Sequence, residues 1–261
     1  MLEHAVVGID HSPATDQVLE ELRCLPRLGV RRVTLVTVLG GHYPQAPEER
    51  HRDHYRALLE EMAGQVEDLE VEVEVRSGQP AGELRLAASG RGADLIVAGS
   101  HGHTPWRDLF LGSTVLDLVR TSRVPVLLLP LGDSDAERGG GVLLATDGSD
   151  AAAPAERLAV TLGEAVGGTA VTVLSDREVG AAEQESASAH LEQVAGTALT
   201  WHVEHGPLPE SVGRLAERQA ADLIVVGARG RNPLTGLLLG STAEHLLRTA
   251  RRPVLLVPAS R

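Results

Sequence analysis

Residues 95–114 read LIVAGSHGHTPWRDLFLGST, and residues 223–242 read LIVVGARGRNPLTGLLLGST. Each stretch begins with a short apolar run typical of a buried strand and continues as Gly-x2-Gly-x9-Gly-Ser-Thr toward a helix-like segment. Because glycine tolerates positive φ and lets a ligand approach the backbone closely, such a turn between strand and helix favours phosphate binding. The sequence therefore predicts two phosphate-binding loops in one chain.

The candidate residues of these loops are the glycines and the hydroxyl residues that follow the last glycine. They are Gly99, Gly102, Gly112, Ser113 and Thr114 in the first copy and Gly227, Gly230, Gly240, Ser241 and Thr242 in the second. A single glycine of this kind is more often an ordinary turn at the end of a strand. The same spacing in both copies favours a ligand site over that alternative. The two serines are also expected to cap the helices that follow.

The duplication extends beyond the glycines. Residues 4–12 read HAVVGIDHS where residues 141–149 read GVLLATDGS, and the ends of the two copies also agree. Between the copies, residues 131–141 read LGDSDAERGGG, which is polar and glycine-rich, as is typical of a linker. We therefore expect a first domain at residues 1–131, a linker at 132–140 and a second domain at 141–261.

Within each copy, short β-branched runs alternate with longer helix-like segments, which indicates βαβ units around a parallel sheet. The expected strands lie near 4–9, 33–39, 70–76, 94–99 and 124–129, and near 141–146, 169–174, 198–204, 221–226 and 253–257. The expected helices lie near 13–25, 48–67, 80–88 and 113–121, and near 150–166, 179–195, 207–219 and 241–248. The predicted fold class is α/β, with two tandem Rossmann-like domains of five parallel strands each.

The composition excludes several classes of function. The 261 residues carry a formal net charge of −12, which argues against binding to a nucleic acid polymer. All 24 basic residues are arginine, so neither a P-loop lysine nor a Schiff-base lysine exists. Cys24 is the only cysteine, which excludes an intrachain disulfide, and the apolar runs are too short to span a membrane. We expect a soluble, cytoplasmic protein that binds a small ligand.

Asp10 and Asp147 follow the first expected strand of each copy, whereas the glycine loops follow the fourth. In an open parallel sheet, ligands bind at the carboxyl ends of the strands where the strand order reverses. If the first and fourth strands are neighbours there, each aspartate faces its glycine loop across one crevice. The free N–H groups at the start of the next helix favour an anion, such as the phosphates of a nucleotide. An alternative role for both aspartates, compatible with ligand contact, is to cap the first helix.

These motifs make the chain similar to tandem members of the universal stress protein family, and the resemblance covers nearly its whole length. Gly-x2-Gly-x9-Gly-Ser/Thr is the motif of the family's ATP-binding branch. The resemblance implies a five-stranded α/β sandwich of strand order 3-2-1-4-5 in each domain. It also implies that the two domains pair through their last strands, within residues 124–130 and 253–258. We further expect that two chains associate into a homodimer.

The resemblance also implies roles for single residues. It puts Asp10 and Asp147 at the adenosine, Val38 and Val173 beside the adenine, and the glycine loops with Ser113 and Ser241 at the ribose and phosphates. The alternative for the two valines is a purely structural role in the core. Members of the family often bind ATP without rapid turnover. We therefore expect ATP in each domain, with Mg²⁺ accompanying its phosphates.

The two loops differ in charge. Arg229 and Arg231 stand in the second copy where the first copy has His101 and His103. Because arginine stays charged near neutral pH and histidine does not, we expect the second site, with Arg229, to bind ATP more tightly. The alternative is that these side chains point into solvent. The first copy also carries an additional segment, residues 40–47, which is a candidate lid over the first site.

Neither a Gly-x-Ser-x-Gly nor a His-Glu-x-x-His motif occurs, and the histidine pairs lack the further ligands of a structural zinc site. We therefore expect no catalytic and no metal-binding residues. The leading function is a stress-response sensor or regulator that binds ATP with little or no turnover and acts on a downstream protein partner. The alternatives are a weak Mg²⁺-dependent ATPase and a chaperone-like interaction module with vestigial sites.

Overall fold

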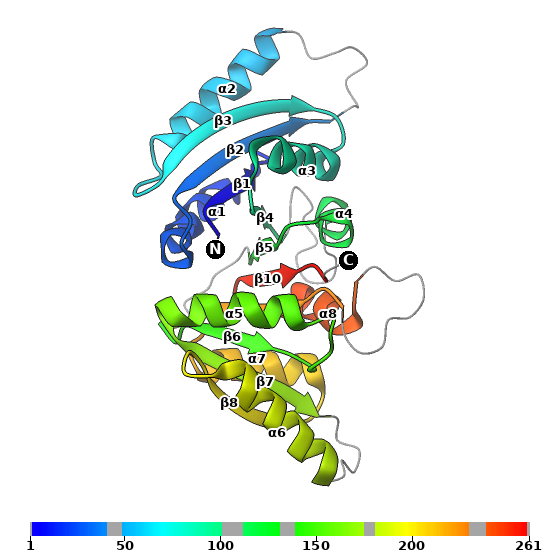
Figure 1. Cartoon of the computed structure of the whole chain (residues 1–261). Helices are drawn as coiled ribbons and strands as arrows, with labels where there is room; N and C mark the ends of the chain where they lie inside the picture. The colour runs from blue at the N-terminus through cyan, green and yellow to red at the C-terminus, as the bar shows by residue number, and fades with distance from the viewer. Residues whose placement is uncertain are drawn as a thin grey trace. The chain divides into compact units, whose positions relative to one another are not determined.

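The computed structural model describes residues 2–40, 49–100, 112–130, 139–174, 181–229 and 239–259. Its contacts divide the chain into two compact units, Met1–Leu131 and Gly132–Arg261. Figure 1 shows each unit as a sheet covered by helices, the first running from blue to green and the second from green to red. We call these units the first domain and the second domain and describe each by itself.

Five parallel strands form the sheet of the first domain, in the order β3-β2-β1-β4-β5. The strands are β1 His4–Gly8, β2 Arg32–Leu39, β3 Glu70–Ser77, β4 Leu95–Gly99 and β5 Val126–Leu129. The chain adds β2 and β3 on one side of β1 and then returns to add β4 and β5 on the other. The strand order therefore reverses between β1 and β4, which confirms the predicted order.

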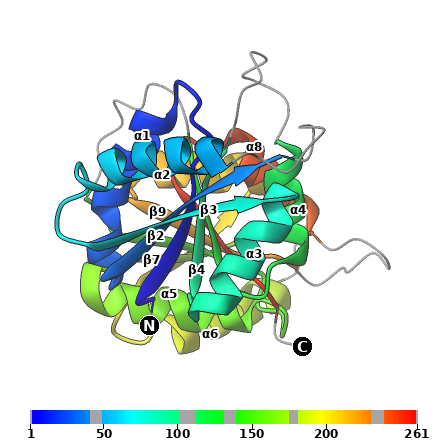
Figure 2. The same cartoon turned by 90° about the horizontal axis from the view of Figure 1, so that it is seen from above.

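Helices cover both faces of this sheet. They are α1 Thr15–Glu21, α2 Glu49–Ala63, α3 Pro80–Arg91 and α4 Ser113–Thr121, with a 3₁₀ segment, η1 Leu22–Leu28, directly after α1. Figure 2 shows α1 and α2 on one face of the first-domain sheet and α3 and α4 on the other. The predicted single helix over residues 13–25 is wrong in its second half. Pro26 lacks an N–H and its ring crowds the carbonyl four residues earlier, so the chain tightens into η1.

The second domain repeats this architecture, with strand order β8-β7-β6-β9-β10, all parallel. The strands are β6 Val142–Ala145, β7 Gly168–Leu174, β8 Thr200–His205, β9 Leu223–Gly227 and β10 Val254–Val257. The helices are α5 Ala153–Val166, α6 Ala181–Ala195, α7 Leu208–Arg218 and α8 Ser241–Thr249. Among the described residues, no helix combines the length and apolarity needed to cross a membrane.

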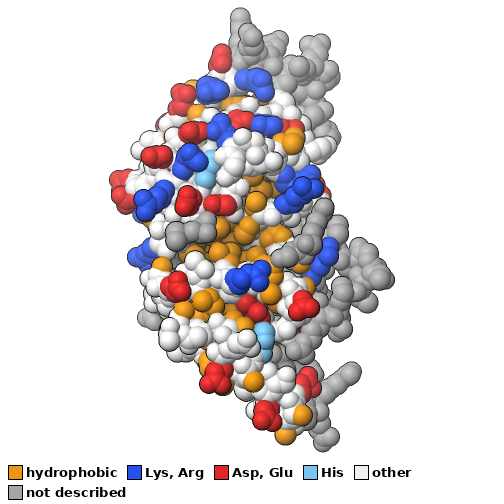
Figure 3. Space-filling model, in the orientation of Figure 1, with side chains coloured by type: hydrophobic (Ala, Val, Ile, Leu, Met, Phe, Trp, Pro, Cys, Tyr) orange, Lys and Arg blue, Asp and Glu red, His pale blue; other side chains and the backbone are white. Residues whose placement is uncertain are grey.

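Burial follows the position of each strand in its sheet. The residues of β4, β6 and β9 are almost all buried, because each of these strands is flanked by two others and covered by helices on both faces. The edge strand β3 instead alternates glutamate with valine. Arg76 hydrogen-bonds Glu74 and Glu83, while Arg91 hydrogen-bonds Glu74, and these ion pairs cover the edge. Charged side chains of both signs intermingle over the region of β3 and α3 (Figure 3), which disfavours pairing with another chain.

An aspartate just before the fourth strand of each domain holds the chain that enters the first strand. The Asp94 carboxylate accepts hydrogen bonds from the N–H of Glu3 at 2.9 Å and of His4 at 3.2 Å. In the second domain, Asp222 accepts from the N–H of Gly139 at 2.8 Å and of Gly141 at 3.2 Å. This pair was not predicted, although Asp-Leu-Ile-Val recurs in both copies.

We predict that Asp94→Ala lowers the free energy of unfolding by about 1–2 kcal/mol, because two backbone N–H groups lose a charged acceptor that is partly open to water. Urea denaturation followed by circular dichroism measures the change. Asp53→Ala, on the exposed surface of α2, is the control and should change stability by no more than about 0.5 kcal/mol. Equal effects of the two substitutions would contradict the role of Asp94 in holding the chain that enters β1.

A second prediction concerns His4, which is 3% exposed at the start of β1. Its Nε2 lies 2.9 Å from Thr34 Oγ1, and its buried Nδ1 has no hydrogen-bond partner in the part of the chain that the structure describes. Burial, with a further contribution from the nearby Arg32 guanidinium, holds the pKa of His4 below its ordinary value of 6.5. The unfolded chain therefore binds a proton that the folded chain rejects, and stability falls as pH drops below 6.5 toward the folded-state pKa.

Comparison of the chain with its His4→Gln variant isolates this effect from the other histidines. Glutamine keeps a donor for Thr34 but does not titrate. The free energy of unfolding, measured between about pH 7.5 and pH 5.5, should fall more steeply for the parent than for the variant. Identical pH slopes would refute the assignment, as would an NMR titration in which the His4 ring titrates above 6.5.

Candidate functional site

The pairing of β6 with β9 brings the two predicted halves of the second site together. Ala145, the last residue of β6, is in register with Val226 of β9. Asp147 therefore follows β6, and Gly227 ends β9, at the same carboxyl edge of the sheet. This is the position at which the strand order reverses, and it is where open α/β sheets bind ligands.

Local hydrogen bonds shape the turn that carries Asp147. The N–H of Thr146 donates to the carbonyl of Val171 at 3.0 Å, which extends the β6 pairing by one residue. The Asp147 Oδ1 atom accepts a hydrogen bond from the N–H of Ser149 at 3.0 Å, and Gly148 between them has φ of 69°. Aspartate and glycine suit this geometry because the first bonds its own backbone two residues on and the second tolerates positive φ.

Helix α8 begins at the same edge. Its N-cap is Gly240, whose N–H donates to the carbonyl of Ala228 at 2.8 Å, so the helix start is pinned beside the end of β9. The next three residues are Ser241, Thr242 and Ala243, whose N–H groups belong to the first turn and have no partner within the helix. They present the positive end of the helix dipole to an anion.

The structure corrects the expected role of the two serines. Ser113 and Ser241 are the first residues of α4 and α8, the N-caps are Gly112 and Gly240, and neither helix has a side-chain cap. Both glycines have extended ψ near 146°, and without a Cβ they leave the first turn of the helix open to a ligand.

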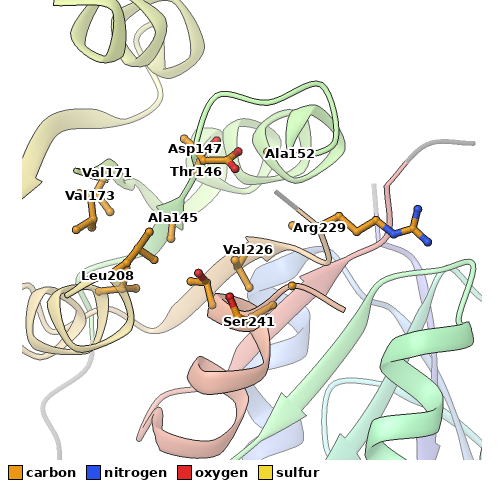
Figure 4. Close-up of a pocket in the computed structure, with 15 residues that line it drawn as sticks. Ala145, Thr146, Asp147, Ala152, Val171, Val173, Leu208, Val226, Arg229 and Ser241 are labelled. Carbon is orange, nitrogen blue, oxygen red and sulfur yellow. The ribbon is translucent and has the colours of Figure 1, made fainter. Parts of the chain in front are cut away.

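A pocket of about 310 Å³ lies between these elements (Figure 4). It is lined by Ala145, Thr146, Asp147, Ala152, Val171, Val173, Leu208, Val212, Val226, Gly227, Arg229, Gly240, Ser241, Thr242 and Ala243. Val171, Val173 and Leu208 lie at one end of the pocket, and Arg229 lies at the other. Asp147 and Ser241 face the space between these ends from opposite sides. The pocket therefore has an apolar end, a carboxylate in its middle and a positively charged end.

Most of the residues predicted for the second site meet in this pocket. They are Asp147, Val173, Gly227, Arg229, Gly240, Ser241 and Thr242. Gly230 lies outside the described residues, as do Gly102, His101 and His103 of the first copy and Arg231 of the second. The expected lid, residues 40–47, is described only at residue 40.

The first domain positions its candidate residues in the same way. Asp10 follows β1 and Gly99 ends β4, and these two strands are paired in parallel. Val38 lies in β2, and Gly112 is the N-cap of α4, with Ser113 and Thr114 in the first turn. The carboxyl edge of this sheet therefore repeats the arrangement seen in the second domain.

The turn after β1 is built differently from that after β6. His11 takes the position of Gly148, and its φ is also positive, at 55°. The Thr37 hydroxyl donates to the carbonyl of Ile9 at 3.2 Å, so it accepts the hydrogen bond from His11 Nε2 at 2.8 Å. The His11 ring also lies 5.0 Å from the ring of Tyr55 on α2.

The reason for the motif glycines differs in part from the one expected. Gly99, Gly112, Gly227 and Gly240 are absent from the residues with positive φ, so the tolerance of glycine for that backbone does not explain these four. Space is the constraint at Gly227, where an added Cβ would lie 3.4 Å from Ala152 Cα and 3.2 Å from the Arg229 carbonyl oxygen. The tighter of these two contacts is with the Arg229 carbonyl, in the turn that follows β9, so the path of that turn favours glycine at this position.

Sequence reasoning missed the pocket residues contributed by α7 and by the segment before α5. Leu208 and Val212 lie one turn apart on α7, and Ala152 precedes α5. Leu208 and Val212 are apolar residues four positions apart, a spacing that occurs in any helix that packs on a sheet. The spacing alone therefore does not indicate a pocket. Only the packing of α7 over β7 shows that they reach the pocket.

Together, the fold and the pocket define a duplicated α/β protein with a pocket at the switch point of its second-domain sheet. The model of the Universal stress protein family matches residues 1–130 and again residues 141–258. The chain therefore belongs to the universal stress protein family.

Several proteins resemble the chain over all or part of its length. It is 29% identical to Universal stress protein Rv2623 of Mycobacterium tuberculosis, over 98% of this chain and 96% of that protein. It is 33% identical to Universal stress protein Rv2005c of the same organism, over 64% of this chain and 63% of that protein. A crystal structure of a universal stress protein from Archaeoglobus fulgidus superposes with a TM-score of 0.78 at 23% identity, covering 98% of each chain. This structural likeness supports the fold.

Proposed function

We propose that the second domain binds an adenine nucleotide, and that ATP is its physiological ligand. The observation that carries this proposal is the pocket at the ends of β6 and β9, with an apolar end, a central carboxylate and a positively charged end. A nucleotide has the same order of chemical groups, from a flat base through a ribose to phosphates. The volume of about 310 Å³ is near the lower limit for small-molecule pockets, about 300 Å³, so it suits the nucleoside while the phosphates extend outward.

The apolar end suits the base. Val173 is 9% exposed and Val171 is fully buried, so these β7 side chains form a rigid wall, and Leu208 of α7 faces the same space. Apolar walls with few polar groups are typical of sites that take an aromatic ring system. We assign this end to the adenine, as the family resemblance also implies.

The opposite end suits the phosphates. The N–H groups of Ser241, Thr242 and Ala243 and the dipole of α8 attract negative charge, and the Arg229 guanidinium adds a full positive charge. Mg²⁺, where present, would be carried by the phosphates themselves. Asp147 lies between the two ends, where its carboxylate can accept hydrogen bonds from ribose hydroxyls.

We propose an equivalent nucleotide site in the first domain, formed by Asp10, Val38 and the start of α4. One further observation supports it. Thr15 takes the position of Ala152 in the repeat, is 5% exposed, and its buried Oγ1 has no hydrogen-bond partner among the described residues. Because an unsatisfied buried hydroxyl is costly, a polar group of a bound ligand would stabilise it.

The chemistry of the second pocket favours binding of the nucleotide without hydrolysis. Asp147 and Arg229 are the ionisable side chains among its described lining residues. We therefore propose a cytoplasmic stress-response regulator that binds ATP with little turnover and signals its occupancy to a protein partner. Pairing of the two domains through their last strands and formation of a homodimer stay predictions.

We predict that Asp147→Ala removes one class of ATP site, because the ribose loses its acceptor, and leaves the first-domain site intact. Isothermal titration calorimetry measures stoichiometry and affinity for ATP, AMP and cyclic AMP. Asp150→Ala, three residues further along in an exposed position, is the control and should bind like the parent. Absence of any nucleotide binding by the parent, including nucleotide retained on purification, would overturn the proposed function.

We also predict that Arg229→Gln weakens ATP binding by roughly fivefold and leaves adenosine binding unchanged, because Arg229 lies at the end of the pocket that we assign to the phosphates. The measurement uses the Asp10→Ala chain, in which the second site is the one titrated. Arg251→Gln, also exposed, removes the same charge elsewhere. An equal loss of ATP and adenosine affinity would show that Arg229 acts on the fold. Because His101 replaces Arg229 in the first copy, we expect the second site to be the tighter one near neutral pH.

A further inference from the structure

A buried carboxylate stands directly behind the turn that carries Asp147. Glu156 on α5 is 6% exposed. Burying an ionised carboxylate is unfavourable unless several hydrogen bonds compensate it. The corresponding position of the first domain is Leu19 on α1, which is 7% exposed, so the fold itself does not require a charge there. The glutamate therefore calls for an explanation specific to the second domain.

Three hydrogen bonds form a continuous chain through Glu156. The N–H of Gly148 donates to Thr146 Oγ1 at 3.1 Å, and the Thr146 hydroxyl donates to Glu156 Oε1 at 2.5 Å. His190 Nε2, from α6, lies 2.8 Å from the same Oε1 atom. Because a carboxylate only accepts hydrogen bonds, Nε2 carries the proton in this contact. Each donor thus has an acceptor, and neighbouring bonds in such a chain polarise and strengthen one another.

This hydrogen-bond network holds the residues on both sides of Asp147 in place. Thr146 precedes it and Gly148 follows it, and the two are joined by the hydrogen bond to Thr146 Oγ1. The His190 ring also packs against Gly148, where an added Cβ would lie 3.1 Å from His190 Cδ2. Asp147 itself lines the pocket, whereas Glu156 and His190 do not.

The first domain lacks the Thr146 hydroxyl and the Glu156 carboxylate of this network. Ile9 stands in place of Thr146, Leu19 in place of Glu156, and His11 in place of Gly148. Its turn is held through the hydrogen bond between His11 and Thr37 instead. One molecule therefore contains two ways to support the turn with the aspartate, one through His11 and Thr37 and one through a buried carboxylate.

We infer that Thr146, Glu156 and His190 are positioning residues that aim the Asp147 carboxylate at the ribose hydroxyls of the nucleotide in the second domain. The inference rests on the proposed function. It makes the second site selective for ribonucleotides, because the gain from a fixed carboxylate is realised only when hydroxyl donors are present. A ligand without ribose hydroxyls gains nothing from the network.

The test compares ATP with 2′,3′-dideoxy-ATP, by calorimetry on the full chain carrying Asp10→Ala. The parent should bind ATP roughly tenfold more tightly than the dideoxy analogue. Thr146→Val, which removes the hydroxyl but keeps the shape, should bring this ratio close to one, mainly by weakening ATP. The separate variants Thr146→Ser and Glu156→Gln keep the donors and acceptors of the hydrogen-bond network. Each should retain most of the parent's ratio of ATP affinity to dideoxy-ATP affinity.

Two further variants separate positioning from loss of folding. Thr146→Ile combined with Glu156→Leu imports the apolar pair of the first domain, leaves no buried charge, and should fold yet lose the selectivity. The matched control is Thr161→Val, which removes an exposed hydroxyl from α5, the helix that carries Glu156. This variant should keep the selectivity for ATP over the dideoxy analogue. In an Asp147→Ala background, Thr146→Val should have no further effect, since the network acts through that carboxylate.

The outcomes distinguish the inference from the proposed function. If the parent binds neither nucleotide at the second site, the proposed function fails. If the parent binds both and the folded Thr146→Val and double variants keep the parent ratio, the inference fails while the proposed function stands. An equal loss of affinity for both nucleotides would assign the network to general stability and would also overturn the inference.

Discussion

Parallel pairing of the first strand with the fourth is the constraint on which the rest of each domain depends. In the second domain the register of β6 on β9 sets Ala145 beside Val226. The chain must leave the sheet at that edge in two places, once as the turn with Asp147 and once toward the start of α8. A carboxylate and a helix N-terminus thus meet although they lie far apart in sequence, and between them the sheet leaves a pocket with an apolar floor.

The two domains show how one backbone plan accommodates different side-chain chemistry behind the same site. In the first, His11 occupies a left-handed backbone position and bonds Thr37, while Leu19 fills the core behind it. In the second, glycine takes the left-handed position, and the space it leaves admits the ring of His190. That ring and Thr146 together supply the hydrogen bonds that a buried Glu156 requires. Each solution is consistent internally, and a glutamate in place of Leu19 would be buried without the donors that Thr146 and His190 give to Glu156.

Much of the fold could be predicted from the sequence because its elements are short, strongly patterned and duplicated. Each expected strand and helix exists, and the two copies confirm each other. The errors lie at local boundaries, where specific contacts decide. Gly112 and Gly240 take the cap positions expected for the following serines, and Pro26 converts the end of the first helix to η1. The clamps made by Asp94 and Asp222 escaped notice because a carboxylate before a strand has no periodic signature.

The sequence by itself determined the fold class, the duplication and most polar residues of the candidate site, Thr146 excepted, because glycine spacing, β-branched runs and strand-end aspartates are local signals. Tertiary structure alone decided which helices close the pocket and what supports its carboxylate. Leu208 and Val212 look like ordinary core residues until α7 packs over β7, and Glu156 looks like a surface glutamate until α5 and α6 enclose it. Both outcomes depend on contacts between segments distant in the chain, and side-chain burial is a property of that packing rather than of any local pattern.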